Sequence, residues 1–150
     1  MTSHIGKIVS VAAGVPATFD KAGYEALTWV VVANPIVAPS PGWETSLSDG
    51  PNLTTGITKG DKGASVGRVS EMSFEEVAAD PGQVALIGYA APSYVAEISV
   101  RVVEPTGTNT HTYMSGIASN LMENEATTET FQGFTCSFRQ NYNHVRTTAP

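Results

Sequence analysis

Three short segments in the C-terminal half alternate apolar with polar residues, and this alternation constrains the fold more than any other feature of the chain. They are residues 94–103, 113–118 and 134–140. In the first segment one set of alternate positions is apolar and the other polar: Tyr94, Ala96, Ile98, Val100 and Val102 against Glu97, Ser99 and Arg101. This is the pattern of a half-buried strand. The C-terminal half is therefore predicted to be sheet. No recognisable catalytic group lies in it, which favours a protein that covers, binds or assembles.

Length and composition indicate one domain over residues 1–150, since 150 residues suffice for a single apolar core. Charged residues make up only 15% of the chain, against about 25% in a typical soluble domain. Low charge with many Thr, Ser and Gly residues suits a β-protein whose surfaces are covered by copies of itself. A β-domain that is merely rich in Ser and Thr remains an alternative. The net charge of -6 and the lack of a basic patch argue against stable binding of nucleic acid.

The N-terminal half predicts further strands and a short helical turn. Residues 7–12 and 28–32 are expected to be strands, the second apolar on both faces and well buried. Asp20 is expected to cap a helical turn that runs through Leu27. Residues 68–78 resume the strand pattern, with Met72 and Phe74 inward and Glu71, Ser73 and Glu75 outward.

A capping box at residues 80–83 predicts a helix over about 81–90, with Asp80 as N-cap and Gln83 as its reciprocal partner. This helix and the strands together predict a mainly β fold with one flanking α-helix. The expected architecture is a sheet sandwich or a half-open barrel. Cys136 lies on the apolar side of its strand and is expected to be a core residue.

Residues 42–67 form a long polar, Gly-rich segment that nevertheless contains apolar residues. Such a length without secondary structure is unusual inside a compact domain, so we expect a projecting hairpin that folds against a partner. A mobile loop whose tryptophan packs on its own domain is the alternative. The candidate contact residues are Trp43, Leu47, Leu53, Ile57, Lys59, Asp61 and Lys62.

Fragments that imitate catalytic or metal-binding motifs lack the required context. Ser65 lies in a Gly-x-Ser-x-Gly pattern, but no strand precedes it and no helix follows it. His4, His111 and His144 show no metal-ligand spacing. We therefore expect no enzyme activity, no cofactor and no metal. The first residues resemble no secretory signal and no segment is apolar enough to span a membrane, which predicts synthesis and folding in a cytoplasm.

Residues 9–29 resemble the opening of the major tail tube proteins of long-tailed (siphovirus-type) bacteriophages. Those proteins begin with a similar "PATYD-x-x-G-F-x-A-L" phrase before a strand, and here the chain reads Pro16-Ala-Thr-Phe-Asp-Lys-Ala-Gly-Tyr-Glu-Ala-Leu27. The order of parts agrees as well, including the long polar loop and the helix after Asp80. The proline cluster before the loop and the C-terminal segment from Asn141 to Arg146 depart from the commoner pattern.

The resemblance implies a tail-tube-type β-sandwich or half-open barrel that assembles into stacked hexameric rings in the virion tail, built in the host cytoplasm. The implied partners are further copies, a tape-measure protein, and tail terminator and tail-tip proteins. DNA would pass through without stable binding, and no membrane partner is implied. The long loop would reach a neighbouring ring. The candidates for the face that lines the channel are Glu71, Ser73, Glu75, Glu97, Ser99 and Arg101.

Other functions remain open from the sequence. A carbohydrate-binding β-sandwich would need Trp29, Trp43 and Tyr94 to form one exposed aromatic platform. Another small virion protein, a capsid decoration or tail terminator protein, would share the β fold. An esterase would need Ser65 as its nucleophile.

Overall fold

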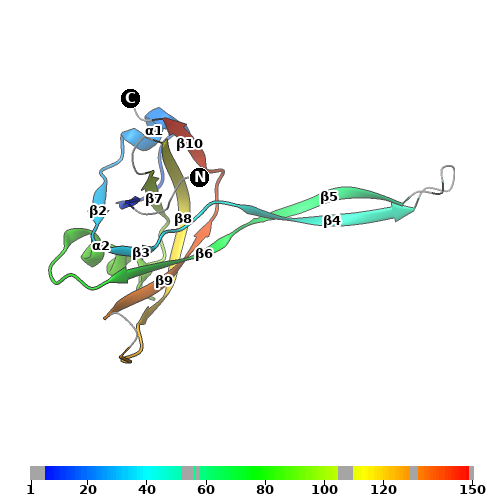
Figure 1. Ribbon diagram of the computed structural model, residues 1–150. Coiled ribbons are helices and arrows are strands. Elements are labelled where there is room, and N and C mark those ends of the chain that lie inside the picture. Colours follow the sequence, from blue (N-terminus) through cyan, green and yellow to red (C-terminus); the bar gives the residue numbers. More distant parts are fainter. Residues whose placement is uncertain (1–5, 52–55, 57, 105–109, 129–131, 149–150) are drawn as a thin grey trace.

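Strands dominate the computed structural model, which describes residues 6–51, 56, 58–104, 110–128 and 132–148. In chain order the elements are β1 (Ile8–Ala13), α1 (Lys21–Glu25), β2 (Val30–Val32), β3 (Pro35–Val37), β4 (Trp43–Pro51), β5 (Thr58–Gly67), β6 (Val69–Glu75), α2 (Pro81–Ala90), β7 (Ile98–Val103), β8 (Thr110–Glu123), β9 (Gly133–Gln140) and β10 (Val145–Thr148) (Figure 1). Eight strands form one antiparallel sheet, and β4 and β5 form a separate two-stranded sheet. The prediction of a mainly β protein is confirmed. Two short helices accompany the sheets, where the expected architecture had one flanking helix and a helical turn.

The eight-stranded sheet starts and ends with strands that are neighbours in the sequence. Its order is β2-β1-β7-β8-β9-β6-β3, with β10 beside β8. Only Ala33 and Asn34 separate β2 from β3, so the two edge strands are brought close to each other by the chain itself. Asn34 makes this connection in the left-handed region at φ 49°, which asparagine tolerates better than most residues. The edges do not pair within the described residues, so the curved sheet does not close into a barrel.

Helix α2 joins the end of β2 to the end of β6, the neighbour of edge strand β3, through Asp80 and Gln83. The Asp80 carboxylate accepts hydrogen bonds from the backbone N–H of Gln83 at 3.0 Å and of Ala33 at 3.1 Å. The Gln83 amide nitrogen donates to the carbonyls of Ala33 at 2.9 Å and of Glu75 at 2.7 Å, and its oxygen accepts from Val77 N–H at 2.9 Å. The predicted helix and its N-cap are confirmed. The Gln83 side chain, however, binds the ends of β2 and β6 instead of the Asp80 N–H.

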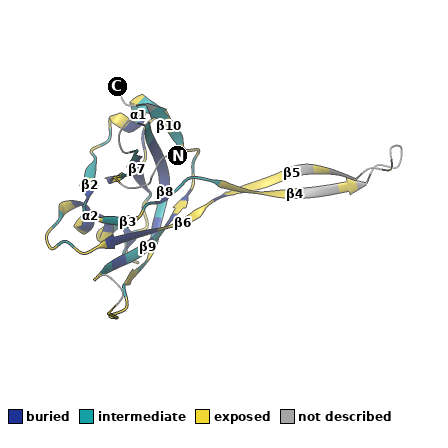
Figure 2. Ribbon diagram, viewed as in Figure 1, coloured by how far each residue is buried: buried dark blue, intermediate teal, exposed yellow. Residues whose placement is uncertain are grey.

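The apolar core lies between the sheet and α2. The predicted core residues Met72, Phe74 and Cys136 are fully buried in it. Leu86 is the fully buried residue that α2 contributes. Figure 2 shows that buried residues concentrate in the body of the protein and that the β4–β5 hairpin is mostly exposed where it is described. The core is therefore confined to the body.

A second layer covers part of the opposite face of the sheet and includes α1. Asp20 caps this helix as predicted, accepting from Gly23 N–H at 2.8 Å. Tyr24 is fully buried, stacks on Tyr113 with ring centres 5.0 Å apart, and its hydroxyl lies 2.9 Å from that of Ser115. The short helix α1 is therefore held on the sheet by its buried Tyr24 side chain, which packs over β8.

Two strand predictions need correction. Residues 28–32 were expected to be buried on both faces, but β2 is three residues long, lies at a sheet edge and leaves Val31 53% exposed. The strand expected over 94–103 starts only at Ile98, and Tyr94 instead packs against Tyr89 of α2 with ring centres 5.1 Å apart. The C-terminal segment, whose packing the sequence left open, adds β10 to β8.

Candidate interaction surface

The β4–β5 hairpin projects from the body as a long arm (Figure 1). We use "the arm" for residues 43–67. The two strands pair antiparallel from Trp43 opposite Gly67 to Pro51 opposite Thr58, with a register shift between Thr45 and Leu47. Neither strand has an extensive contact with any other element. A two-stranded hairpin alone is marginally stable in water, and the body adds few contacts along the described part of the arm.

Gln140 fastens the base of the arm to the body. This residue is 1% exposed, and its amide oxygen accepts from Gly42 N–H at 2.9 Å. Its own N–H donates to the carbonyl of Arg68 at 3.2 Å, so it holds the residues that flank both arm strands. A Cβ atom on Gly67 would lie 1.6 Å from the Gln140 carbonyl oxygen, which explains the glycine. The sequence does not predict this role of Gln140, because nothing in the local pattern of β9 indicates a contact with Gly42, 98 residues away.

The arm carries exposed apolar side chains, as the sequence predicted for its contact residues. Leu47 is 72% exposed and Trp43 38% exposed. Lys62 is exposed and lies directly opposite Leu47 in the register. Of the other candidates, Leu53 and Ile57 lie outside the described residues, as do the side chains of Lys59 and Asp61.

The polar face of β6 continues across β9 to the end of β8. By register, Glu71 lies opposite Ser137, and Ser137 opposite Ser119. Glu71 and Glu75 are both exposed on this face. We call this region, beyond the α1 layer, the open face. It offers carboxylates to solvent without a cation paired to either one within the described residues.

Not all of the candidates for a channel lining lie on the open face. Ser99 is on the same side of the sheet but fully buried beneath the α1 layer, where its hydroxyl donates to the Gly14 carbonyl at 2.8 Å, so it cannot face a channel. Arg101 is partly buried and its guanidinium carbon lies 5.2 Å from the centre of the Trp29 ring. Ser73 is 8% exposed. Alternation places Ser99 on the polar side of the sheet, but it does not reveal a covering segment at Gly14, 85 positions away.

Glu97 precedes β7 and faces the C-terminal segment. Its carboxylate accepts from the Tyr142 hydroxyl at 2.9 Å. This hydrogen bond raises the pKa of the Tyr142 hydroxyl above its ordinary value. The Phe19 ring stacks on the Tyr142 ring, with the two ring centres 4.6 Å apart. Glu97 therefore has a structural partner, and the segment before β10 is held to the α1 layer.

The residues required for the alternative functions do not come together. Trp29 packs against Tyr113, with ring centres 5.8 Å apart, whereas Trp43 is in the arm and Tyr94 is beside α2. They form no common aromatic platform. Ser65 lies within β5, its hydroxyl 2.8 Å from that of Thr45, and not at a turn from strand to helix.

The two described histidines, His111 and His144, have different partners. His111 contacts the Tyr113 hydroxyl at 3.2 Å, and His144 lies beside the Gln140 amide at 3.4 Å. His4 lies outside the described residues. In the part of the chain that the structure describes, no three His, Cys, Asp or Glu side chains are grouped to hold a metal ion.

Comparisons with known proteins give no family. None of the protein-family models matches this sequence, and no curated protein is similar to it. Among the described helices, neither has the length and apolar character needed to cross a bilayer. What the chain does must therefore be argued from its own residues and geometry.

Proposed function

We propose that this chain is a non-enzymatic structural protein of the tail-tube type, in which copies assemble into rings that stack into the tail tube of a siphovirus-type bacteriophage. The observation that carries the proposal is the arm, which projects from a well-packed body and, in the described chain, leaves Leu47 72% and Trp43 38% exposed. A projecting hairpin with exposed apolar side chains gains stability when a partner covers it, because a two-stranded hairpin alone is marginally stable. The resemblance of residues 9–29 to tail tube proteins adds support from an independent part of the sequence.

The edges of the sheet also favour assembly. Strands β2 and β3 each have a side without a partner strand in the described chain, and Val31, Ile36 and Val37 are exposed on them. Free edges with apolar side chains promote strand addition unless another subunit or element covers them. A ring formed from many copies of one chain can cover such edges by repeating a single head-to-tail contact.

The open face supplies the proposed lining of the channel. Glu71 and Glu75 project from β6 into solvent. In a ring each carboxylate would be repeated by symmetry, and the resulting negative field would repel the DNA phosphates. DNA could then pass through the tube without being held.

The proposal is tested by replacing Trp43 with alanine. If a second copy buries this side chain, its removal weakens association by about 2 kcal/mol or more, or roughly 30-fold. The melting temperature of the dissociated chain should change little, since the arm contributes nothing to the core. Val95→Ala is the matched control, because Val95 is 85% exposed and lies outside the arm.

Sedimentation velocity over a range of concentrations gives the association strength of each variant. We expect large assemblies for the unaltered chain and for Val95→Ala, and a shift to small species for Trp43→Ala. An unaltered chain that stays monomeric at high concentration would refute the proposed function.

A further inference from the structure

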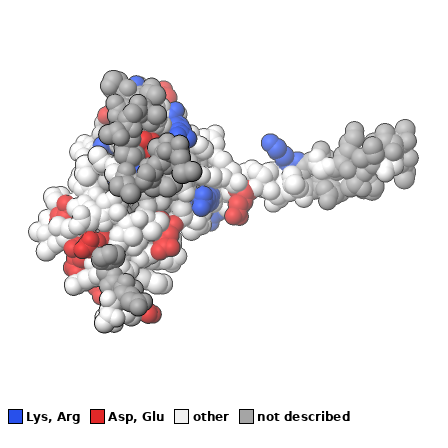
Figure 3. All heavy atoms as spheres, in the orientation of Figure 1, with Lys and Arg blue, Asp and Glu red and all other residues white. Residues whose placement is uncertain are grey.

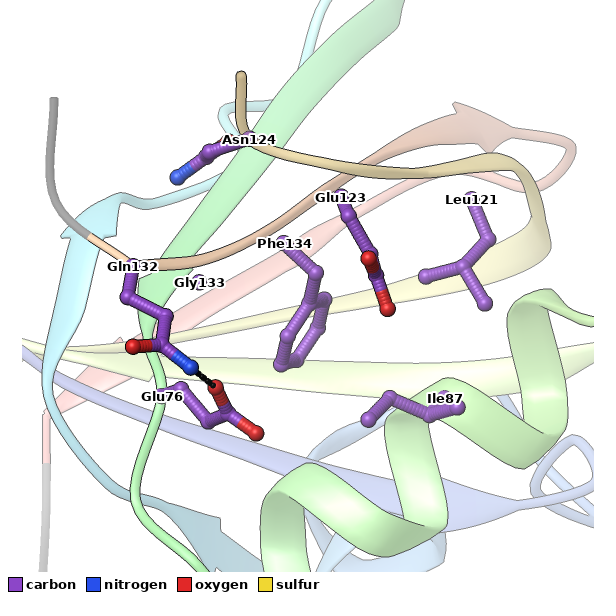
Figure 4. Close-up of a pocket in the computed structure, with 8 residues that line it drawn as sticks. All are labelled: Glu76, Ile87, Leu121, Glu123, Asn124, Gln132, Gly133 and Phe134. Atoms are coloured by element: carbon purple, nitrogen blue, oxygen red, sulfur yellow. Dashed lines mark hydrogen bonds between the residues drawn. The ribbon is translucent and has the colours of Figure 1, made fainter. Parts of the chain in front are cut away.

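A hollow of about 250 Å³ lies between α2 and the hairpin of β8 and β9. Figure 4 shows the Phe134 ring in its middle, with Ile87 of α2 and Leu121 of β8 on the adjacent walls. Phe134 is 4% exposed and forms the floor, whereas Ile87 remains 40% exposed. The Phe134 ring is thus almost fully covered, and the accessible apolar surface of the hollow belongs to Ile87 and the partly buried Leu121.

Two carboxylates flank this apolar floor. Glu123 follows Leu121 by two positions on β8 and is exposed. Glu76 is also exposed, and its carboxylate accepts a hydrogen bond of 2.7 Å from the Gln132 amide, which holds it at the opposite side of the hollow (Figure 4). The site thus combines an apolar floor with a negative rim. It suits an occupant that presents an apolar and a cationic side chain next to each other.

The arm presents such a pair. Leu47 and Lys62 are direct cross-strand partners, so their side chains lie on the same face of the hairpin. Leu47 is the most exposed large apolar side chain described in the arm, at 72%. Figure 3 shows a basic group on the arm and acidic groups gathered over the far end of the body, the same end that carries α2. The pair is apolar and cationic, and the hollow is apolar with a negative rim.

The arm of the same chain is directed away from this hollow. Its base is fixed to β9 by Gln140, and it leaves the body on the side away from α2 (Figure 1). A second copy of the chain has no such restriction. The contact would join two different surfaces, arm to hollow, and a contact of this type repeats indefinitely or closes into a ring.

We propose that the hollow between α2 and the β8–β9 hairpin receives the arm of a second copy of this chain. Leu47 packs on Ile87 and Leu121, above the Phe134 ring, and Lys62 pairs with the carboxylates of Glu76 and Glu123. This inference rests on the proposed function, because it names the surface that the arm contacts during assembly. The contact can be absent even if the chain assembles, so the two proposals are tested separately.

Mixed variants that each gain one cysteine test the contact directly. One batch carries Leu47→Cys and the other Ile87→Cys, and the two are mixed under conditions that permit assembly and then oxidised. The native Cys136 is fully buried and its pKa is raised to about 12, so it does not compete for disulfide formation. Val15→Cys replaces Ile87→Cys in the control, because Val15 is 37% exposed, close to the 40% of Ile87, and lies outside the hollow.

We expect a reducible dimer of the Leu47→Cys and Ile87→Cys chains, at least about fivefold more abundant than in the control mixture. Equal yields in the two mixtures, while the unaltered chain forms rings or tubes, would overturn the inference and leave the proposed function standing. An unaltered chain that never assembles would overturn both.

A charge exchange provides the second test, in case a cysteine disturbs the arm. Lys62→Glu and Glu123→Lys should each raise the concentration needed for assembly by about fivefold, and together they should restore it. Lys21→Glu is the control, since Lys21 is in α1, away from both surfaces. A double variant that assembles worse than either single variant would contradict the pairing of Lys62 with Glu123.

Discussion

Replacing Gln83 with leucine removes the side chain that holds the end of edge strand β2 to the end of β6. Three backbone groups then lose their partners: the carbonyls of Ala33 and Glu75 and the N–H of Val77. An unsatisfied buried group costs about 1–3 kcal/mol. All three lie at element ends that water reaches in part, and Gln83 itself is 2% exposed. Because water partly satisfies these groups, we expect the free energy of unfolding to fall by about 2–4 kcal/mol. This is near the lower end of the summed cost of the three unsatisfied groups.

The assay is urea unfolding followed by fluorescence, at a concentration where the chain is monomeric. For a domain of this size the loss corresponds to a decrease of roughly 4–16 °C in melting temperature. Gln132→Leu is the control, because Gln132 is exposed and its side chain donates to the exposed carboxylate of Glu76, so the variant should stay within about 0.5 kcal/mol of the unaltered chain. A Gln83→Leu variant as stable as Gln132→Leu would refute the role of Gln83 in joining β2 to β6.

Substitutions of a buried thiol, of two tyrosines and of two exposed glutamates give three more predictions. Burial raises the pKa of the Cys136 thiol from 9.0 to about 12, so the unfolded chain loses this proton first and stability should fall as the pH rises from 9 to 12. Cys136→Ala should show a shallower alkaline loss in urea midpoints than the unaltered chain, and parallel curves would contradict it. Tyr24→Phe should lower the free energy of unfolding in urea by about 1 kcal/mol, because it removes a buried hydrogen bond. Tyr142→Phe should lower it by less, because its hydrogen bond is partly exposed. The reverse order would argue against the α1 layer as a stabilising element. Glu71→Lys combined with Glu75→Lys should leave tube length unchanged but make DNA ejection slow at low salt and faster at high salt, whereas kinetics equal to wild type at both salts would show that these acids do not line the channel.

Local patterns predict the elements of this fold well where the pattern is complete within the element. The capping residues Asp20 and Asp80 are polar groups next to the helix starts that they cap, so sequence alone identifies both. Likewise Met72 and Phe74 alternate with polar neighbours and are buried as predicted. These predictions succeed because the governing interactions span only a few residues.

Contacts between distant segments account for the errors. Ser99 looks like a surface residue because polar residues alternate with apolar ones around it, yet the loop at Gly14 covers it from 85 positions away. Val31 looks buried because its neighbours are also valines, yet β2 lies at a sheet edge. The role of Gln140 at the base of the arm is a further case. No periodicity encodes such layers and edges, because they depend on how the whole sheet curls.

The candidate interaction surface was predictable in part. Apolar residues within the polar, Gly-rich segment 42–67 indicate a partner, and the structure shows Leu47 and Trp43 exposed there. The hollow that includes Phe134 and Ile87 was not predicted. Its residues come from α2, β8 and β9, which the sequence separates and only the packing of α2 on the sheet brings together.

Electron microscopy of the purified, unaltered chain tests the central claim most directly. The proposed function predicts stacked rings around an open channel, with the arm of each subunit seated on a second copy and the open face of β6 directed toward the channel. A chain that remains monomeric at all concentrations up to the limit of its solubility, or that forms assemblies without a central channel, would contradict it.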